Sequence, residues 1–78
     1  MQNSTEPTKN IHQGRNVKRF REMLGMKQEA LALELGDDWT QKKVSLLEAK
    51  DVIDADILKQ VAEILKVPVE AIVNFEEE

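Results

Sequence analysis

Apolar residues recur along this chain at the spacing of short amphipathic helices. Val17, Phe20 and Leu24 stand three and four residues apart and predict one buried stripe on a first helix. Gly25 follows this stripe and is expected to end the helix, because glycine tolerates the left-handed backbone found after helix ends.

A second, shorter helix is predicted over Gln28 to Leu35. Leu31, Ala32 and Leu35 form its apolar side, and Gly36 is expected to close it in the same way as Gly25 closes the first helix.

The third predicted helix runs from about Gln41 to Ala49. A polar turn precedes it, in which Asp38 or Thr40 can accept a hydrogen bond from an unpaired backbone amide. Val44 and Leu47 form its buried stripe, since they are three residues apart.

Two further helices complete the pattern. Asp54 can cap a fourth helix, and Pro68 suits the first turn of a fifth. The apolar stripe of the fourth helix comprises Ile57, Leu58, Val61, Ile64 and Leu65, and that of the fifth comprises Val69, Ile72 and Val73.

The chain is therefore predicted to be an all-α, compact five-helix bundle. Proline interrupts the one β-branched run, at residues 67–69, so no strand is expected there. Residues 1–10 are polar and predicted to form a disordered arm, residues 11–75 the folded domain, and residues 76–78 an acidic tail.

Length and composition narrow the class of protein. At 78 residues there is room for one domain, and 41% apolar residues suffice for a core. The absence of cysteine excludes disulfides and thiolate metal sites and suits a reducing cytoplasm. No apolar run approaches the roughly 18 residues of a membrane span.

Charge is divided unevenly along the chain, although the net charge is -4. Residues 9–50 carry nine Lys or Arg against six Asp or Glu, whereas residues 51–78 carry two against eight. A basic first half is a mild indication of a polyanionic partner.

Catalytic and metal-binding chemistry find little support. His12 is the single histidine and is interpreted as a solvated residue at the start of a helix. The acidic pairs Asp37, Asp38 and Asp54, Asp56 lack calcium-loop spacing and are better explained as helix caps. No glycine-rich phosphate loop occurs, so neither an enzyme nor a cofactor or metal site is expected.

The second and third helices have the arrangement of a major-groove reader. Gln41, Lys42 and Lys43 would lie in the exposed first turn of the third helix. Glutamine can bond the N6 and N7 edge of adenine, lysine the O6 and N7 acceptors of guanine, and Leu46 can contact a thymine methyl. On pattern alone, an ordinary solvated helix face is the slightly favoured explanation.

The stretch from Val17 to Ile72 resembles the lambda-repressor-like (Xre or Cro-type) helix-turn-helix family. The resemblance runs through VKRFREMLGMKQEALALELG, KKVSLLEAK and LKQVAEILKVPVEAI. It implies that Gln28 contacts a phosphate and braces the recognition helix, and that Ala32 lets the two helices approach. The implied base-reading residues are Gln41, Lys42, Ser45 and Leu46. The expected backbone contacts are Gln28, Lys27, Lys43, Lys50 and Arg19.

Three features depart from the family pattern. The turn before the third helix is longer and holds Trp39, which is interpreted either as a core anchor or as an exposed contact. Lys27 replaces the usual Ser or Thr cap of the second helix. Lys66 replaces the usual glycine after the fourth helix, so that turn is expected to close differently.

The function expected from these features is sequence-specific binding of double-stranded DNA by a transcriptional regulator. Homodimerisation is expected, because one short helix reads few base pairs, and Ile72, Val73 and Phe75 offer a candidate surface. The alternative is a protein-interaction module on the same fold, such as an antitoxin or adaptor. The acidic tail and the apolar Met23, Leu33 and Trp39 favour that alternative.

Overall fold

The computed structural model describes residues 11–76, and the predicted all-α bundle is confirmed. Within this range there is no strand, and the predictions for residues 1–10 and 77–78 lie outside the described residues. The five helices are α1 (Gln13–Met23), α2 (Gln28–Leu35), α3 (Gln41–Glu48), α4 (Ala55–Leu65) and α5 (Val69–Asn74).

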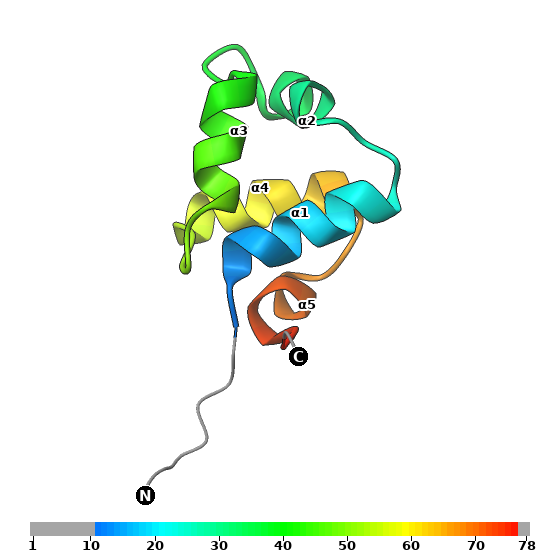
Figure 1. The fold of residues 1–78 in the computed structure, drawn as a ribbon, viewed down its shortest axis with the longest axis vertical. Helices are drawn as coiled ribbons and strands as arrows, with labels where there is room; N and C mark the ends of the chain where they lie inside the picture. The colour runs from blue at the N-terminus through cyan, green and yellow to red at the C-terminus, as the bar shows by residue number, and fades with distance from the viewer. Residues whose placement is uncertain (1–10, 77–78) are drawn as a thin grey trace, which may run out of the picture.

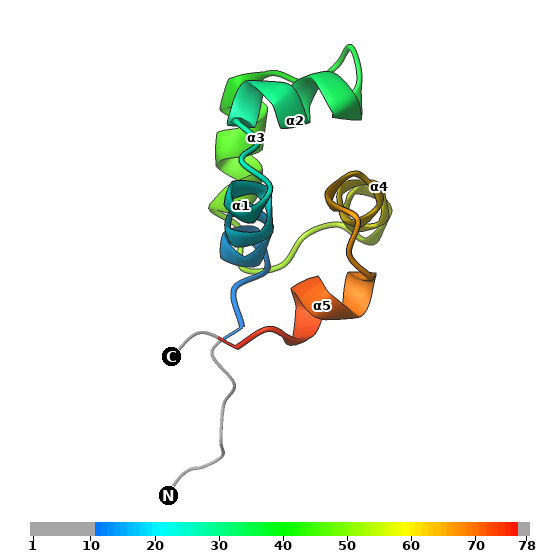
Figure 2. The same ribbon diagram turned by 90° about the vertical axis from the view of Figure 1, so that its right-hand side faces the viewer.

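The helices pack around α1 and α4, which lie across the middle of the molecule (Figure 1). Both views show α2 on one side of this pair and α5 on the other, while α3 runs from the level of α2 down alongside the end of α1 (Figure 1 and Figure 2). The buried apolar residues come from every helix and from the loop before α4: Val17, Leu31, Ala32, Val44, Leu47, Ile53, Leu58, Val61, Ala62, Leu65 and Ile72.

One member of the predicted first stripe is placed wrongly by the periodicity. Leu24 is 51% exposed, whereas Val17 is fully buried and Phe20 packs against the core. The reason is that α1 ends at Met23, so Leu24 is the C-cap and no longer follows the helical face. The buried position on that side belongs to Arg21.

The turn after α4 also corrects an expectation. Lys66 takes the left-handed backbone of a glycine, with φ 62° and ψ 39°. The Val67 amide donates to the Ala62 carbonyl and the Lys66 amide to the Glu63 carbonyl. The turn at Gly25 has the same pair of bonds, from Met26 to Arg21 and from Gly25 to Glu22. Both helices therefore end in the same Schellman-type turn.

Gly36 closes α2 differently from Gly25. Its φ of 124° and ψ of -178° lie in a region that glycine alone adopts readily. The chain therefore leaves α2 in an extended direction rather than in a left-handed turn.

The N-caps of α4 and α5 lie within one residue of the positions that the sequence predicts. The Asp54 carboxylate accepts from the Asp56 amide at 3.1 Å and caps α4. Pro68 lies at the N-cap of α5 rather than inside its first turn.

The end of α5 is fastened to α1 by a buried amide that the sequence pattern does not reveal. Asn16 Nδ2 donates to the carbonyls of Ile72 at 2.7 Å and Phe75 at 3.0 Å. Ile72 is fully buried by this packing, so it cannot belong to the predicted dimer surface. Val73 packs partly against the core, and Phe75 is 38% exposed.

We predict that Lys66→Gly raises the free energy of unfolding by about 1 kcal/mol, because a left-handed backbone disfavours any residue with a Cβ. Urea denaturation monitored by helical circular dichroism measures the change. Lys66→Ala is the control, since alanine keeps the Cβ. An equal gain from both substitutions would locate the cause in the lysine side chain instead.

Candidate nucleic-acid interface

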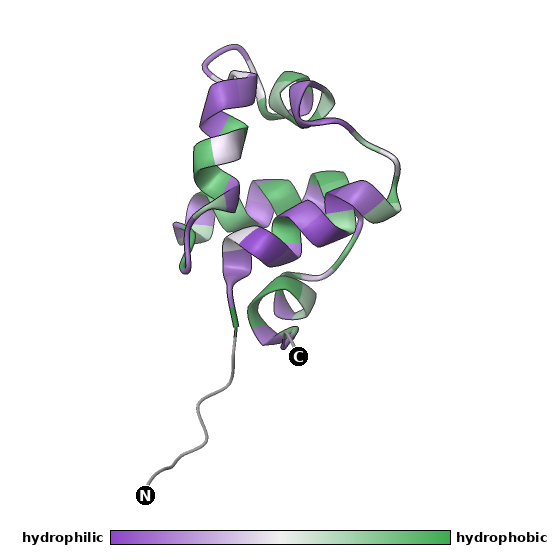
Figure 3. Ribbon diagram, viewed as in Figure 1, coloured by the Kyte–Doolittle hydropathy of each residue, from purple (hydrophilic) through white to green (hydrophobic). Residues whose placement is uncertain are grey.

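The first turn of α3 presents polar side chains outward. Of the two predicted cap candidates, Thr40 rather than Asp38 is the N-cap, and its hydroxyl accepts from the Lys43 amide at 3.2 Å. Val44 and Leu47 are buried, as their spacing predicts. Figure 3 shows the resulting division, with a hydrophilic first turn of α3 followed by mostly hydrophobic turns.

All four predicted base-reading residues lie on the exposed side of α3. Gln41, Lys42 and Ser45 are exposed, and Leu46 is 58% exposed. They share one face because residues i, i+1, i+4 and i+5 fall on one side of a helix. The helix begins at Gln41, in agreement with the predicted start at about this residue.

The long turn before α3 is anchored at Trp39. This side chain is half-buried and packs against the core, which agrees with the core-anchor interpretation. The Trp39 amide donates to the Gly36 carbonyl at 3.0 Å, so the additional residues form a compact turn. The Lys43 ammonium donates to the Asp38 carbonyl at 2.6 Å, which holds this lysine beside the turn.

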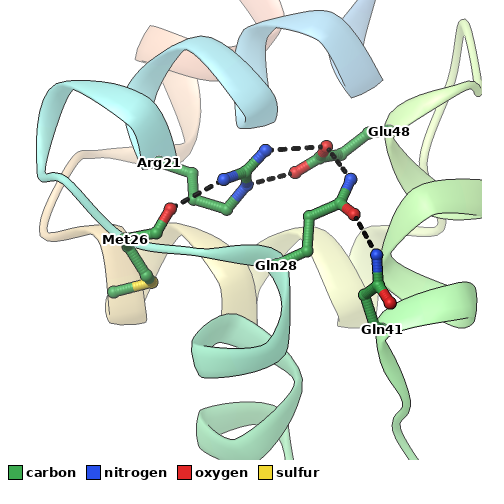
Figure 4. A network of polar contacts seen from close by, with 5 residues as sticks. All are labelled: Arg21, Met26, Gln28, Gln41 and Glu48. Carbon is green, nitrogen blue, oxygen red and sulfur yellow. Dashed lines mark hydrogen bonds and ion pairs between the residues drawn. The ribbon is translucent and has the colours of Figure 1, made fainter.

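A chain of polar contacts links α1 to the first turns of α2 and α3 (Figure 4). Arg21 Nε lies 2.7 Å from Glu48 Oε2 and Arg21 Nη2 lies 3.2 Å from Oε1, so the pair is bidentate. Gln28 Nε2 donates to Glu48 Oε1 at 2.9 Å, and Gln41 Nε2 donates to Gln28 Oε1 at 3.1 Å. Gln28 thus braces α3, as the resemblance implies.

The hydrogen bond between Gln28 and Gln41 brings two helix N-termini to one surface. Lys27, the N-cap of α2, is exposed and makes no side-chain cap. The first backbone amides of α2 therefore lack a capping side chain and, together with the helix dipole, favour an anion. This is the chemistry that a DNA phosphate supplies.

The C-terminal end of α3 is held against the start of α1. The Gly14 amide donates to the Lys50 carbonyl at 2.9 Å, and the Gln13 amide donates to the Asp51 carbonyl at 3.0 Å. A Cβ on Gly14 would lie 2.6 Å from the Glu48 carbonyl carbon. The close approach of the two backbones therefore requires glycine at this position.

His12 completes the same junction. Its Nδ1 accepts from the Arg15 amide at 3.0 Å and caps α1, while Nε2 lies 3.1 Å from Asp51 Oδ1. The side chain is only 19% exposed, so its interpretation as a solvated residue is wrong, although its place at the helix start is right.

The predicted backbone contacts are not all brought together. Lys27 and Lys43 flank the paired N-termini of α2 and α3, and Lys50 is exposed just after α3. Arg19 lies elsewhere: its guanidinium is 5.1 Å from the centre of the Phe75 ring, beyond α5. Arg19 therefore lies apart from Lys27, Lys43 and Lys50.

The sequence pattern does not single out three residues that position the surface, Arg21, Glu48 and Gly14. Arg21 and Glu48 enter only the charge count of residues 9–50. A signal was available, because Arg21 is four residues from Val17 and shares its helical side. Gly14 gave a weaker signal, as a glycine in the first turn of a helix.

Comparison with known proteins identifies the family. A helix-turn-helix family model matches residues 17–72, which is well over half of the chain. The chain therefore belongs to the lambda-repressor-like (Xre-type) helix-turn-helix family of DNA-binding domains. Neither the search of curated proteins nor that of solved structures gave a match.

Residues 11–76 contain no cluster of three or more His, Asp or Glu side chains arranged to hold a metal ion. No helix in this range combines the length and apolarity needed to cross a bilayer.

We predict that Gly14→Ala lowers the free energy of unfolding by about 2 to 3 kcal/mol, because the new methyl group meets the carbonyls at the end of α3. The sign is informative, since alanine is normally the better helix former by about 1 kcal/mol. Urea denaturation measures the effect, and Lys18→Ala on the exposed side of α1 is the control. Stabilisation by Gly14→Ala would contradict the close approach.

Proposed function

We propose that this protein is a transcriptional regulator that reads B-DNA with α3 in the major groove. The observation that carries the proposal is the hydrogen bond from Gln41 to Gln28, which sets the polar first turns of α2 and α3 side by side. A helix fits the major groove, and its first turn can then meet base edges while the neighbouring helix start faces a phosphate.

Gln41 and Lys42 are the proposed base readers, assisted by Ser45 and Leu46. All four side chains are exposed on one side of α3. Glutamine matches adenine and lysine matches guanine, whereas Leu46 offers an apolar contact to a thymine methyl.

The proposed backbone contacts are Lys27, Gln28, Lys43 and Lys50. The Lys27 ammonium and the uncapped first amides of α2 together would attract the same phosphate. Arg19 contributes diffuse attraction only, because its guanidinium stacks on Phe75 away from α3. Binding needs no cofactor and involves no reaction.

The proposal includes a homodimer in the cytoplasm. A single eight-residue recognition helix spans few base pairs, and two half-sites one helical turn apart restore specificity. The chain lacks cysteine, which suits a reducing compartment.

A protein-interaction role on the same fold, as in an antitoxin or adaptor, is the second candidate. Leu33 is 83% exposed and Met23 is 74% exposed. Exposed apolar side chains of this kind can supply apolar contact area to a protein partner, although single ones are common on the surface of a monomer. Trp39 gives less support than the sequence suggested, because it packs against the core.

Selection from a random duplex library at about physiological salt tests the function directly. We expect an enriched motif with two half-sites about 10 base pairs apart. Retention of DNA without any enriched motif, lost by about 200 mM salt, would leave only non-specific attraction and would favour the protein-interaction role.

We predict that Lys42→Ala changes the preferred base at one position of that motif and weakens binding to it by about 1 to 3 kcal/mol. Lys27→Ala, its matched control, removes a backbone contact and should weaken all sequences alike. Titrations of motif and point-variant duplexes measure both effects. A uniform loss for both substitutions would reject Lys42 as a base reader.

A further inference from the structure

Hydrogen bonds connect Arg21, Glu48, Gln28 and Gln41 in a row, and the order of donors and acceptors along this row is fixed. Arg21 and Glu48 are each only 6% exposed, so this end of the row is shielded from water. The Gln41 end is exposed, on the face proposed to meet DNA. A buried ion pair is therefore connected, through two amides, to the reading surface.

Each link in this row allows one arrangement of donors and acceptors. The Arg21 guanidinium only donates, and the ionised Glu48 carboxylate only accepts. The Gln28 contact to Glu48 must therefore be made by its NH₂ group, at 2.9 Å, which turns its Oε1 toward Gln41. Gln41 must in turn offer an N–H to that oxygen, at 3.1 Å.

Gln41 is left with a defined set of groups for DNA. One N–H is used by Gln28, so one N–H and the carbonyl oxygen Oε1 remain. One donor beside one acceptor complements the N7 acceptor and N6 donor of adenine. If the Gln41 amide were rotated by 180°, its oxygen would face Gln28 and its N–H groups would face DNA. That arrangement suits the two acceptors of guanine.

We infer that Glu48, held by Arg21, is a positioning residue that sets the amide orientation of Gln41 and thereby selects adenine. This inference rests on the proposed function, since it concerns the reading of DNA by Gln41. Glu48 itself is buried and does not touch the bases in this assignment.

The substitution Glu48→Gln tests the inference because it exchanges donor and acceptor in the hydrogen bonds from residue 48 to Gln28 and from Gln28 to Gln41. The new amide oxygen takes the place of Oε2, where it accepts the shorter bond from Arg21 Nε at 2.7 Å. Its NH₂ group takes the place of Oε1, so it faces Gln28 and gives up the 3.2 Å bond from Arg21 Nη2. Gln28 then turns its own oxygen inward and its NH₂ group toward Gln41. We expect Gln41 to accept instead of donate, and to present N–H donors to the base.

Two measurements on the folded protein follow this reversal. In the free protein, nuclear Overhauser effects from the Gln28 side-chain amide protons should move from Glu48 Hγ in the wild type to Gln41 Hγ in the variant. In the duplex selection, the adenine preference at one base should fall about tenfold or more in favour of guanine. The preference at the Lys42 position should be unchanged.

A second variant and a control keep the test decisive if Glu48→Gln folds poorly. The double variant Arg21→Met, Glu48→Leu replaces the buried ion pair with apolar side chains. The Gln28 amide can then adopt either orientation, so the preference for adenine should weaken without changing to guanine. Asn16→Ala loosens α5 on the other side of α1 and should lower stability without altering any base preference.

The possible results separate the inference from the function on which it rests. A wild-type protein that selects no motif would contradict the proposed function, while the Overhauser effects would still decide whether Glu48 orients the amides. A selected motif whose adenine preference survives both variants, or Gln28 amide contacts that do not move, would overturn the role of Glu48.

Discussion

The buried pair of Arg21 and Glu48 is the interaction on which the rest of the structure depends. Its nitrogen and oxygen atoms approach to 2.7 Å with both side chains less than a tenth exposed. Two charges leave water at a large cost, and removing one partner from such a pair costs about 3 to 5 kcal/mol. A further Arg21 donor, Nη1, bonds the Met26 carbonyl at 2.7 Å. The pair therefore fixes α3, and the start of the α2 segment, against α1.

Backbone packing between the start of α1 and the end of α3 also fixes the position of α3. Gly14 allows the start of α1 to approach the last carbonyls of α3, and the first amides of α1 bond the loop that follows. The Gln13 side chain extends this contact by accepting from the Ile53 amide at 2.7 Å. Backbone bonds therefore hold α3 at its end and the ion pair holds its last turn, which leaves its first turn exposed.

Most of the fold could be predicted from the sequence because helices leave periodic signals. The stripe of Val44 and Leu47 gave the inward side of α3, and Thr40 its start. Periodicity failed at Leu24, where the helix had already ended. It placed Arg21 on the same side as Val17 but could not show that Arg21 or Asn16 is buried, because the burial of a polar side chain depends on the partners that the fold brings to it. Lys66 shows the converse, since a turn can keep its geometry without the favoured glycine.

The candidate surface was harder to predict than the fold, and the reason is electrostatic. A count of residues treats Arg21 and Glu48 as two surface charges, yet they neutralise each other inside the domain. Their effect at the surface is carried by amides instead, through Gln28 to Gln41. Neutral amides distinguish bases by the order of donor and acceptor, which net charge does not describe. A chain with a net charge of -4 can therefore still present a surface whose order of donors and acceptors is fixed, because its buried charges are paired in this way.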